Sequence, residues 1–293
     1  NKTLGLVAAL LTVSIWASFL IGTRFAVKGN FSVEEVLILR LVPGAVALSP
    51  LMLKFDLIPR GQSWISALIL MIGASAIFPY IVSSGLLYAP VSDGGALAPG
   101  ILPFWTALAV FFITKERPNS IQKLGLALIL SGALIVSLWE IFFTSDSDAW
   151  KGHLRFLAGS GLFAIYSVIF WQSGLTPFHS LIIGLFWGTL FIVPLLLWSG
   201  NVSFSQSNPL EILLMAILQS FIIGISATFL YNFAVKQLGA AESGAFGALT
   251  PILALIGGVI LLGELFKPIK VIGIILVAIG VLLASGIIRR SPN

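Results

Sequence analysis

Charged residues occur along this chain at intervals that leave long apolar stretches between them. Such stretches cover residues 3–23, 94–114, 243–263 and 271–288, and none of them contains Asp, Glu, Lys or Arg. A helix that crosses a lipid bilayer needs about 20 mainly apolar residues, because each residue advances about 1.5 Å through a core about 30 Å thick. Each stretch therefore predicts one transmembrane helix.

Turn residues divide the longer apolar stretches into further helices. The segment 156–210 carries no charge, but 172–177 and 199–201 contain Gly, Pro or Asn, which favour turns. The ten predicted helices cover residues 4–27, 33–53, 64–88, 92–114, 120–139, 152–172, 177–198, 211–237, 241–262 and 268–288. The sequence thus predicts an all-α integral membrane protein with ten transmembrane helices and short loops.

Composition supports this interpretation and excludes most other classes of protein. Charged residues make up 9% of the chain, against about 25% in a typical soluble protein, and the mean hydropathy is +1.07. The net charge of +5 fits positive loops at a membrane better than a nucleic-acid surface. Cys is absent, which excludes disulfides and thiolate metal sites. We expect the lipid bilayer and a small-molecule substrate as partners, with no nucleic acid, metal or cofactor.

Positive residues set the expected orientation of the helices, because cytoplasmic loops carry an excess of Lys and Arg. The side of the N-terminus carries nine of them: Lys2, Lys54, Arg60, Lys115, Arg117, Lys123, Lys236, Arg289 and Arg290. The opposite side carries five: Lys28, Lys151, Arg155, Lys267 and Lys270. This bias places both termini in the cytoplasm.

Several residues recur at an offset of 148 positions. The matching pairs are Pro103 and Pro251, Glu116 and Glu264, Gly125 and Gly273, and Gly132 and Gly280. We therefore predict two five-helix repeats, residues 1–140 and 150–290. Because five is odd, the second repeat enters the membrane from the opposite side, and such inverted repeats are typical of secondary transporters that open alternately to each side. A duplicated membrane protein without transport, such as a scaffold, is the alternative.

A family resemblance accompanies this architecture. The residues that carry it are Trp16-Ala17-Ser18, Leu39-Arg40, Pro103, Leu249-Thr250-Pro251-Ile252 and Leu262-Gly263-Glu264. With them the whole chain resembles the ten-helix drug/metabolite transporter superfamily, in its EamA-type branch, although Lys115-Glu116-Arg117 departs from the Gly-Glu of the second half. The resemblance implies export of amino acids or related metabolites through a central cavity formed mainly by predicted helices 1, 3, 4, 6, 8 and 9. We expect a monomer in the plasma membrane, which in a bacterium is the inner membrane.

Candidate substrate-binding residues are polar or aromatic side chains within the spans. Arg40 is the most costly of them, at about 2.5–3.5 kcal/mol for a mid-membrane Arg. It either binds a substrate carboxylate or bonds backbone carbonyls such as that of Leu39. The others are Trp16, Tyr80, Ser83, Trp105, Tyr166, Trp187, Tyr231 and Asn232. Their rings and polar tips suit the wall of a small-molecule site, while packing of a large bundle is the alternative. Pro103 and Pro251 are candidate hinges.

Acidic residues are absent from the middle of every predicted span. Asp93 and Glu242 each open a helix, where a carboxylate favours the positive end of the helix dipole. His153 and His179 lie near span ends and are interpreted as interface histidines. We therefore expect weak coupling to ion gradients, and we find no buried aspartate pair, zinc motif or Ser-His pair of an intramembrane enzyme.

These observations lead to one function and two alternatives. The chain is expected to export small amphipathic metabolites, with neutral or aromatic amino acids as the leading substrates, by alternating access through a central cavity. A multidrug or lipophilic-cation exporter on the same fold is one alternative, and a passive channel is the other.

The predicted topology can be tested by cysteine labelling, because the chain has no Cys of its own. A membrane-impermeant reagent added outside the cell should modify cysteines placed at Ser145 or Gln206 and leave one at Gln62 unmodified. The reverse pattern of labelling would overturn the topology.

Overall fold

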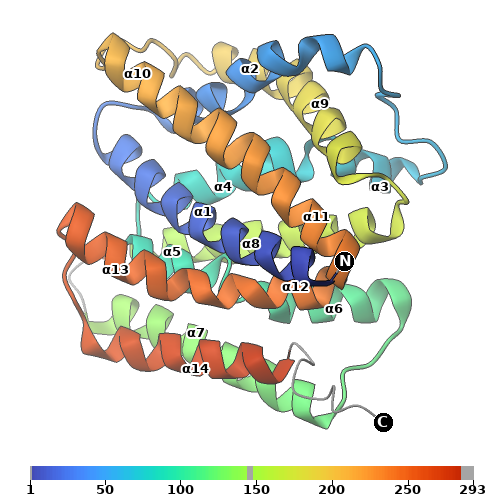
Figure 1. Ribbon diagram of the computed structural model, residues 1–293. Helices are drawn as coiled ribbons and strands as arrows, with labels where there is room; N and C mark the ends of the chain where they lie inside the picture. The colour runs from blue at the N-terminus through green and yellow to red at the C-terminus, as the bar shows by residue number, and fades with distance from the viewer. Residues whose placement is uncertain (1, 144–147, 285–293) are drawn as a thin grey trace.

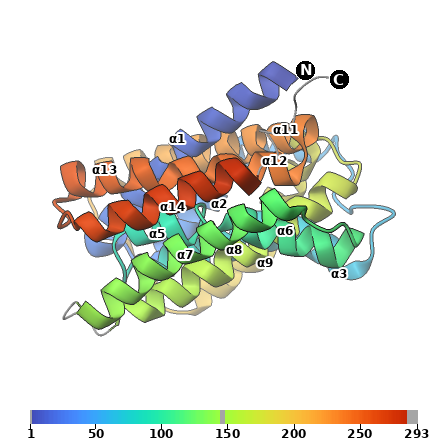
Figure 2. The same ribbon diagram turned by 90° about the horizontal axis from the view of Figure 1, so that it is seen from below.

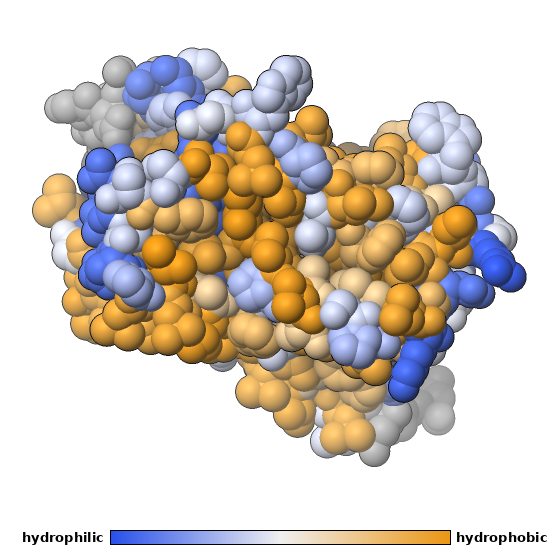
Figure 3. Space-filling model, turned by 90° about the horizontal axis from the view of Figure 1, so that it is seen from above, coloured by the Kyte–Doolittle hydropathy of each residue, from blue (hydrophilic) through white to orange (hydrophobic). Residues whose placement is uncertain are grey.

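The computed structural model describes residues 2–143 and 148–284, and within these ranges every regular element is a helix. The helices run in roughly one direction through the molecule (Figure 1). Seen from above, the surface between its two ends is mainly hydrophobic, with hydrophilic residues gathered towards either end (Figure 3). This belt is the surface expected of a protein whose helices lie in lipid.

The first half contains α1 (Lys2–Lys28), α2 (Val33–Met52), α3 (Trp64–Leu68), the π-helix η1 (Ile69–Ile77), α4 (Phe78–Gly85), α5 (Val91–Leu97), α6 (Leu102–Thr114) and α7 (Ser120–Phe143). The second half contains α8 (Ala149–Gln172), α9 (Pro177–Trp198), α10 (Pro209–Ala216), the π-helix η2 (Ile217–Ala227), α11 (Thr228–Leu238), α12 (Ala240–Ala245), the 3-10 helix η3 (Phe246–Leu249), α13 (Thr250–Leu262) and α14 (Pro268–Ala284). Short elements that follow directly on one another form one continuous membrane-spanning helical segment, as α3, η1 and α4 do over Trp64–Gly85.

The predicted membrane fold is confirmed. Within the described residues, nine helical stretches are long and apolar enough to cross a membrane, and the shorter apolar helix Pro268–Ala284 occupies the place of the tenth. The predicted end of that helix at 288 and the labelling position Ser145 lie outside the described residues. Helix starts agree with the sequence to within a few residues, because the apolar runs that set them are bounded by polar turns.

Helical elements recur at the 148-residue offset found in the sequence. The π-helices begin at Ile69 and Ile217, and α6 and α13 occupy equivalent positions at both ends. The residue that follows each of these two helices also has a similar backbone conformation, with φ of 64° at Lys115 and 66° at Gly263. Lys115 adopts a left-handed conformation that is uncommon for a residue with a Cβ, so the second half has Gly where the first half is strained.

The closest contact between the halves joins α7 and α14, which lie side by side at one edge of the bundle (Figures 1 and 2). A Cβ on Gly132 would lie 2.3 Å from the Gly273 carbonyl oxygen, and one on Gly125 would lie 2.4 Å from that of Gly280. Small residues permit such backbone contact between helices in lipid, where packing rather than hydrophobic burial holds helices together.

This contact gives a stability prediction. Gly132→Leu should lower the free energy of unfolding by about 1–3 kcal/mol, because overpacking forces the two backbones apart. Thermal unfolding in detergent, followed by circular dichroism, measures the loss. Ser131→Leu is the matched control, because Ser131 is the exposed neighbour on the same helix and receives the same side chain. Equal stability of the two variants would contradict the glycine contact.

Candidate functional site

The fourth predicted helix is interrupted inside the bundle. Residues 98–101 separate α5 from α6, and Ala98 has φ −109° and ψ −80°. Pro99 and Pro103 lack an N–H, so they fit a break and the first turn of a helix without losing a regular hydrogen bond. The Ser160 hydroxyl of α8 donates to the Ala98 carbonyl at 2.6 Å. This bond satisfies one of the backbone groups that the break frees within the membrane.

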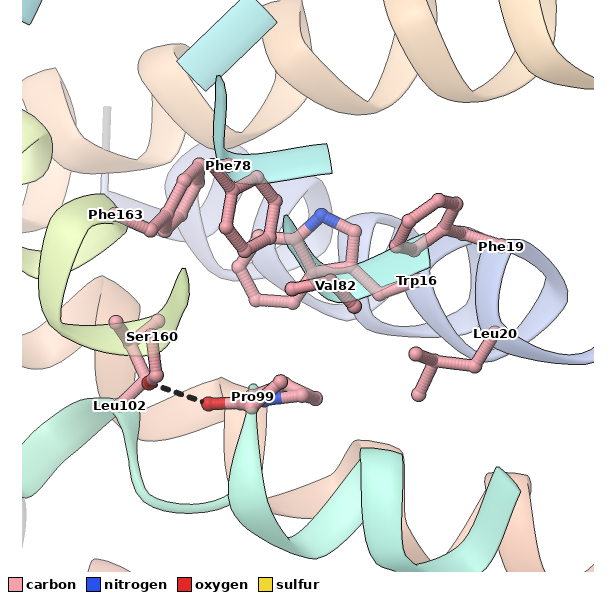
Figure 4. Close-up of a pocket in the computed structure, with 10 residues that line it drawn as sticks. Trp16, Phe19, Leu20, Phe78, Val82, Pro99, Leu102, Ser160 and Phe163 are labelled. Carbon is pink, nitrogen blue, oxygen red and sulfur yellow. Dashed lines mark hydrogen bonds between the residues drawn. The ribbon is translucent and has the colours of Figure 1, made fainter. Parts of the chain in front are cut away.

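A small cavity lies beside the break (Figure 4). Its lining comes from α1, α4, the α5–α6 segment and α8, namely Trp16, Phe19, Leu20, Phe78, Val82, Ala98, Pro99, Leu102, Ser160 and Phe163. No charged side chain is among them. The open space within it is about 20 Å³, which holds about one water molecule. An amino acid could therefore enter only after the walls move apart.

Trp16 is the predicted site residue that lines this cavity. Its ring lies edge-on to Phe163, with centroids 5.4 Å apart, and 5.1 Å from the ring of Tyr231. Aromatic pairs at these distances attract one another by about 0.5–1.5 kcal/mol beyond their burial. The indole thus packs against the rings of Phe163 and Tyr231 while it lines the cavity.

Three other predicted site residues form a polar layer behind Trp16 rather than part of the lining. The Tyr166 hydroxyl lies 2.9 Å from Ser180 Oγ and donates to Asn232 Oδ1 at 3.1 Å. The Tyr231 hydroxyl lies 2.8 Å from Ser167 Oγ. Asn232 Nδ2 is buried without a hydrogen-bond partner. These hydroxyls are occupied within the protein, so their direct contact with substrate stays a prediction.

Trp187 and Tyr80 contact other parts of the chain. The Trp187 Nε1 donates to the Leu57 carbonyl oxygen at 2.6 Å, which ties α9 to the loop after α2. The Tyr80 hydroxyl donates to Glu34 Oε1 at 3.2 Å. Neither side chain is part of the cavity lining, and their role in substrate binding stays untested.

The remaining candidates lie on the helices that form the cavity or pack against it. Trp105 and Ser83 belong to α6 and α4 but are not part of the lining. Pro103 and Pro251 each lie in the first turn of a helix that follows an irregular segment. Pro251 packs directly on α5, since a Cβ on Gly95 would lie 2.9 Å from its Cα. A hinge at either proline stays a prediction.

Arg40 is buried directly behind the cavity wall. Its side chain is 6% exposed, and its Cζ lies 5.3 Å from the centroid of the Phe19 ring, which lines the cavity. Its Nε and Nη1 are buried and have no hydrogen-bond partner. A buried cation that lacks hydrogen bonds is costly. Arg40 can therefore gain much from an anionic group that reaches it.

The structure also brings together charged residues whose association the sequence did not predict. Asp93 of α5 pairs with Lys270 of α14, and His153 Nε2 of α8 lies 2.9 Å from Asp93 Oδ2. Beside them, Arg24 Nε lies 3.6 Å from Glu264 Oε1. We call these five residues the distal cluster, because they lie at the end of the bundle where α1 ends.

The interpretation of His153 as an interface histidine is wrong, because the residue is 3% exposed and bonded to Asp93. Asp93 and Lys270, expected as a helix-start charge and a loop charge, are 0% and 2% exposed. Asp93 is 60 residues from His153 and 177 from Lys270. No local pattern connects positions so far apart, although an Asp and a Lys beside apolar spans were visible candidates for a pair.

Glu264 and Arg24 connect the distal cluster to the backbone. The Glu264 carboxylate accepts the Val91 N–H at 2.9 and 3.1 Å, and Arg24 donates to the Leu86 carbonyl. Burial raises the pKa of the Glu264 carboxyl above its usual range, while the bond from Val91 and the charge of Arg24 lower it by less. These contacts fix the start of α5.

The apolar surface, the all-α bundle and the internal cavity define a multi-pass membrane protein with a site enclosed by its helices. The chain belongs to the EamA-like transporter family, which matches residues 3–138 and again 150–286. The predicted family is confirmed, and the protein is a membrane transporter.

Relatives agree with this assignment. The chain is 28% identical to "Uncharacterized transporter YyaM" of Bacillus subtilis (strain 168), over 75% of this chain and 73% of the relative. It is 26% identical to a "Probable terminal-alkyne amino-acid exporter" of Streptantibioticus cattleyicolor, over 95% and 92%. A crystal structure of another protein is similar with a TM-score of 0.64 at 19% identity, over 99% of this chain and 98% of that one, which shows the fold alone.

The polar layer behind Trp16 gives a prediction. Tyr231→Phe removes the bond to Ser167 while the ring contact with Trp16 remains, so the free energy of unfolding should fall by about 0.5–1.5 kcal/mol. Ser167→Ala removes the same bond from its other side and serves as the matched control. If Tyr231→Phe alters substrate discrimination and Ser167→Ala does not, the Tyr231 hydroxyl reaches the substrate in another conformation.

Proposed function

We propose that the protein exports small amphipathic metabolites that carry a carboxylate, with neutral and aromatic amino acids as the leading substrates. The observation that supports this most directly is the position of Arg40 behind an aromatic cavity wall, with two buried nitrogens that lack partners. The cavity offers apolar and aromatic surface for a side chain, and Arg40 offers a charge for the carboxylate.

The route to Arg40 leads past Phe19. The ring of Phe19 both lines the cavity and lies against the guanidinium, with its centroid 5.3 Å from Cζ. A rotation of this ring would expose the unpartnered nitrogens to a ligand in the cavity. A carboxylate there would form charge-assisted hydrogen bonds, which are roughly twice as strong as neutral ones. Binding of the carboxylate would then remove the free-energy cost of burying the Arg40 nitrogens without hydrogen-bond partners.

The size of the cavity supports a mechanism with moving walls. Its open space of about 20 Å³ is far below that of an amino acid, so the described conformation is closed around the site. We propose that two inverted five-helix repeats, residues 1–140 and 150–290, open it alternately to each side of the membrane. Recurrence of the helical elements at one offset supports two related units.

The alternatives fit the site less well. Aromatic walls also attract lipophilic cations, but Arg40 lies 5.3 Å behind one of those walls and repels them. A passive channel needs a continuous path, whereas the cavity holds about one water molecule. The relative named as a probable amino-acid exporter also favours an amino acid. We further propose a monomer in the bacterial inner membrane, with both termini in the cytoplasm.

Transport in proteoliposomes tests the role of Arg40 with a matched pair of ligands. Phenylalanine and phenylalaninamide share the ring and the amine and differ in the carboxylate. A charge-assisted hydrogen bond contributes about 1.5–3 kcal/mol, so phenylalanine should compete roughly tenfold better or more against a labelled neutral amino acid.

Arg40→Gln should reduce that preference to about equal competition, because the amide no longer pairs with the carboxylate. Arg155→Gln is the control, because Arg155 also lies over an aromatic ring, that of Tyr88 at 4.6 Å, but outside the cavity lining. A preference that survives in Arg40→Gln would contradict the carboxylate site. Strongest competition by lipophilic cations would favour a drug exporter, and flux that does not saturate would favour a channel.

A further inference from the structure

The distal cluster holds a titratable side chain that the proposed substrate route does not use. His153 Nε2 bonds Asp93, whereas its Nδ1 is buried and has no hydrogen-bond partner. Lys270 Nζ contacts the other oxygen of Asp93 and lies 3.3 Å from Ser92 Oγ. The free Nδ1 is the nitrogen at which a neutral imidazole bonded through Nε2 can take up a second proton.

The charges of the cluster balance only while His153 is neutral. The carboxylates of Asp93 and Glu264 then match the cations of Lys270 and Arg24. Protonation of His153 adds one positive charge where water has little access. It also converts Nδ1 into a donor without an acceptor. A proton on Nδ1 would therefore have no acceptor among the contacts of this closed conformation, whereas a conformation in which Nδ1 reaches water would supply one.

Within the described residues, His153 Nδ1 has no hydrogen-bond acceptor. Other titratable groups on α8 and on the segments around its first turn include Tyr80, Tyr88, Asp148, Lys151, Arg155, Tyr166 and Lys267. Lys151 Nζ and Arg155 Cζ lie 5.7 and 4.6 Å from the centroid of the Tyr88 ring, and Lys151 pairs with Asp148 at 2.8 Å. Lys151 and Arg155 thus contact Tyr88 and Asp148 rather than His153.

The helix α5 connects the distal cluster to the cavity. This helix is seven residues long; Asp93 near its start belongs to the cluster, and Ala98 just after its end lines the cavity. Leu20 also lines the cavity, and its Cδ2 is 3.5 Å from the place of a Cβ on Gly94. Movement of the start of α5 must therefore move the cavity wall.

The opposite end of the bundle differs from the distal cluster, although Glu116 corresponds to Glu264 and Lys2 pairs with Glu242 at 3.6 Å there. At the 148-residue offset, Asp93, His153 and Lys270 correspond to Ala241, Gly5 and Gln122, which are uncharged. Ala241 and Gln122 instead line a cleft with about 130 Å³ of open space. Within the described residues, the contact of an Asp with both a His and a Lys is thus found at the distal end.

We propose that His153 is a proton-binding site that couples protonation to opening of the transporter at the distal end. A proton bound from that side would favour opening of the cavity to that side. The inference rests on the proposed transport function for its purpose, but its test needs no substrate. It also replaces the expectation of weak ion coupling, which considered only carboxylates at mid-span.

Cysteine labelling in lipid nanodiscs measures the opening directly, because the chain has no Cys. Leu20→Cys reports on the buried cavity wall, and the exposed Gln206→Cys corrects for the pH dependence of thiol reactivity. Lowering the pH from about 7.5 to 5.5 should raise the ratio of the two labelling rates by about fivefold or more, the lower range of coupling between linked sites.

The chain has two histidines, and two matched variants distinguish their contributions to the pH response. His153→Gln can still donate to Asp93 but cannot gain a proton, and it should abolish the pH response. His179→Gln should retain it, because His179 bonds the Asp56 carbonyl outside the distal cluster. The same response in His153→Gln, or no response in the parent chain, would overturn the proposal.

A second measurement does not depend on the stability of His153→Gln. In the His179→Gln chain, purified without a histidine tag, His153 is the sole histidine, and isotope-labelled histidine gives one set of ring signals in NMR. The ring should gain a proton with the same midpoint pH as the labelling change. A ring that keeps its protonation state between about pH 5 and 8, or titrates at a different midpoint, would also overturn the proposal. Failure of amino-acid transport would leave both results unchanged, so the two functions are judged separately.

Discussion

The lack of hydrogen-bond partners in the bilayer is the constraint on which this structure depends. Backbone groups satisfy one another within the helices, and where α5 gives way to α6 the Ser160 hydroxyl takes the place of a helical donor. Buried charges follow the same rule, because Asp93 is bonded by Lys270 and His153. Against this background, the unpartnered nitrogens of Arg40 and His153 stand out among the described residues. Such groups are candidates for binding a ligand or a proton, because a partner there would form a hydrogen bond that this conformation leaves unmade.

The arrangement of the helices was predictable from the sequence because it depends on local patterns. Apolar runs of spanning length set the helices, and the offset of 148 residues placed the small residues that later prove to join α7 and α14. The resemblance to a transporter family used the same markers and is confirmed. These predictions agree with the structure because each rests on a run of residues about as long as one membrane span or on residues repeated at one spacing.

The partners of individual side chains were not predictable, because they depend on contacts between distant segments. Trp187 had the pattern of a site residue, yet its N–H is bonded by the Leu57 carbonyl. Tyr166 and Tyr231 were assigned to the site by their depth, and depth does not reveal that Ser180 and Ser167 occupy their hydroxyls. Depth also misled the interpretation of His153, since position near a span end was taken for exposure. Of the aromatic candidates, Trp16 lines the cavity because α1 presents it towards the α5–α6 break.

Symmetry in the backbone and asymmetry in the charges have different consequences for transport. In the proposed mechanism, two equivalent sets of helices give a molecule that could open equally well to either side, while the glycine contacts join α7 to α14 at one edge. Such a molecule has no preferred direction unless something distinguishes its ends. The distal cluster does so, because Asp93, His153 and Lys270 meet at one end while Ala241, Gly5 and Gln122 occupy the equivalent positions of the other. In this proposed mechanism, duplication accounts for the capacity to alternate, and divergence of a few buried positions gives the alternation a dependence on the side from which a proton arrives.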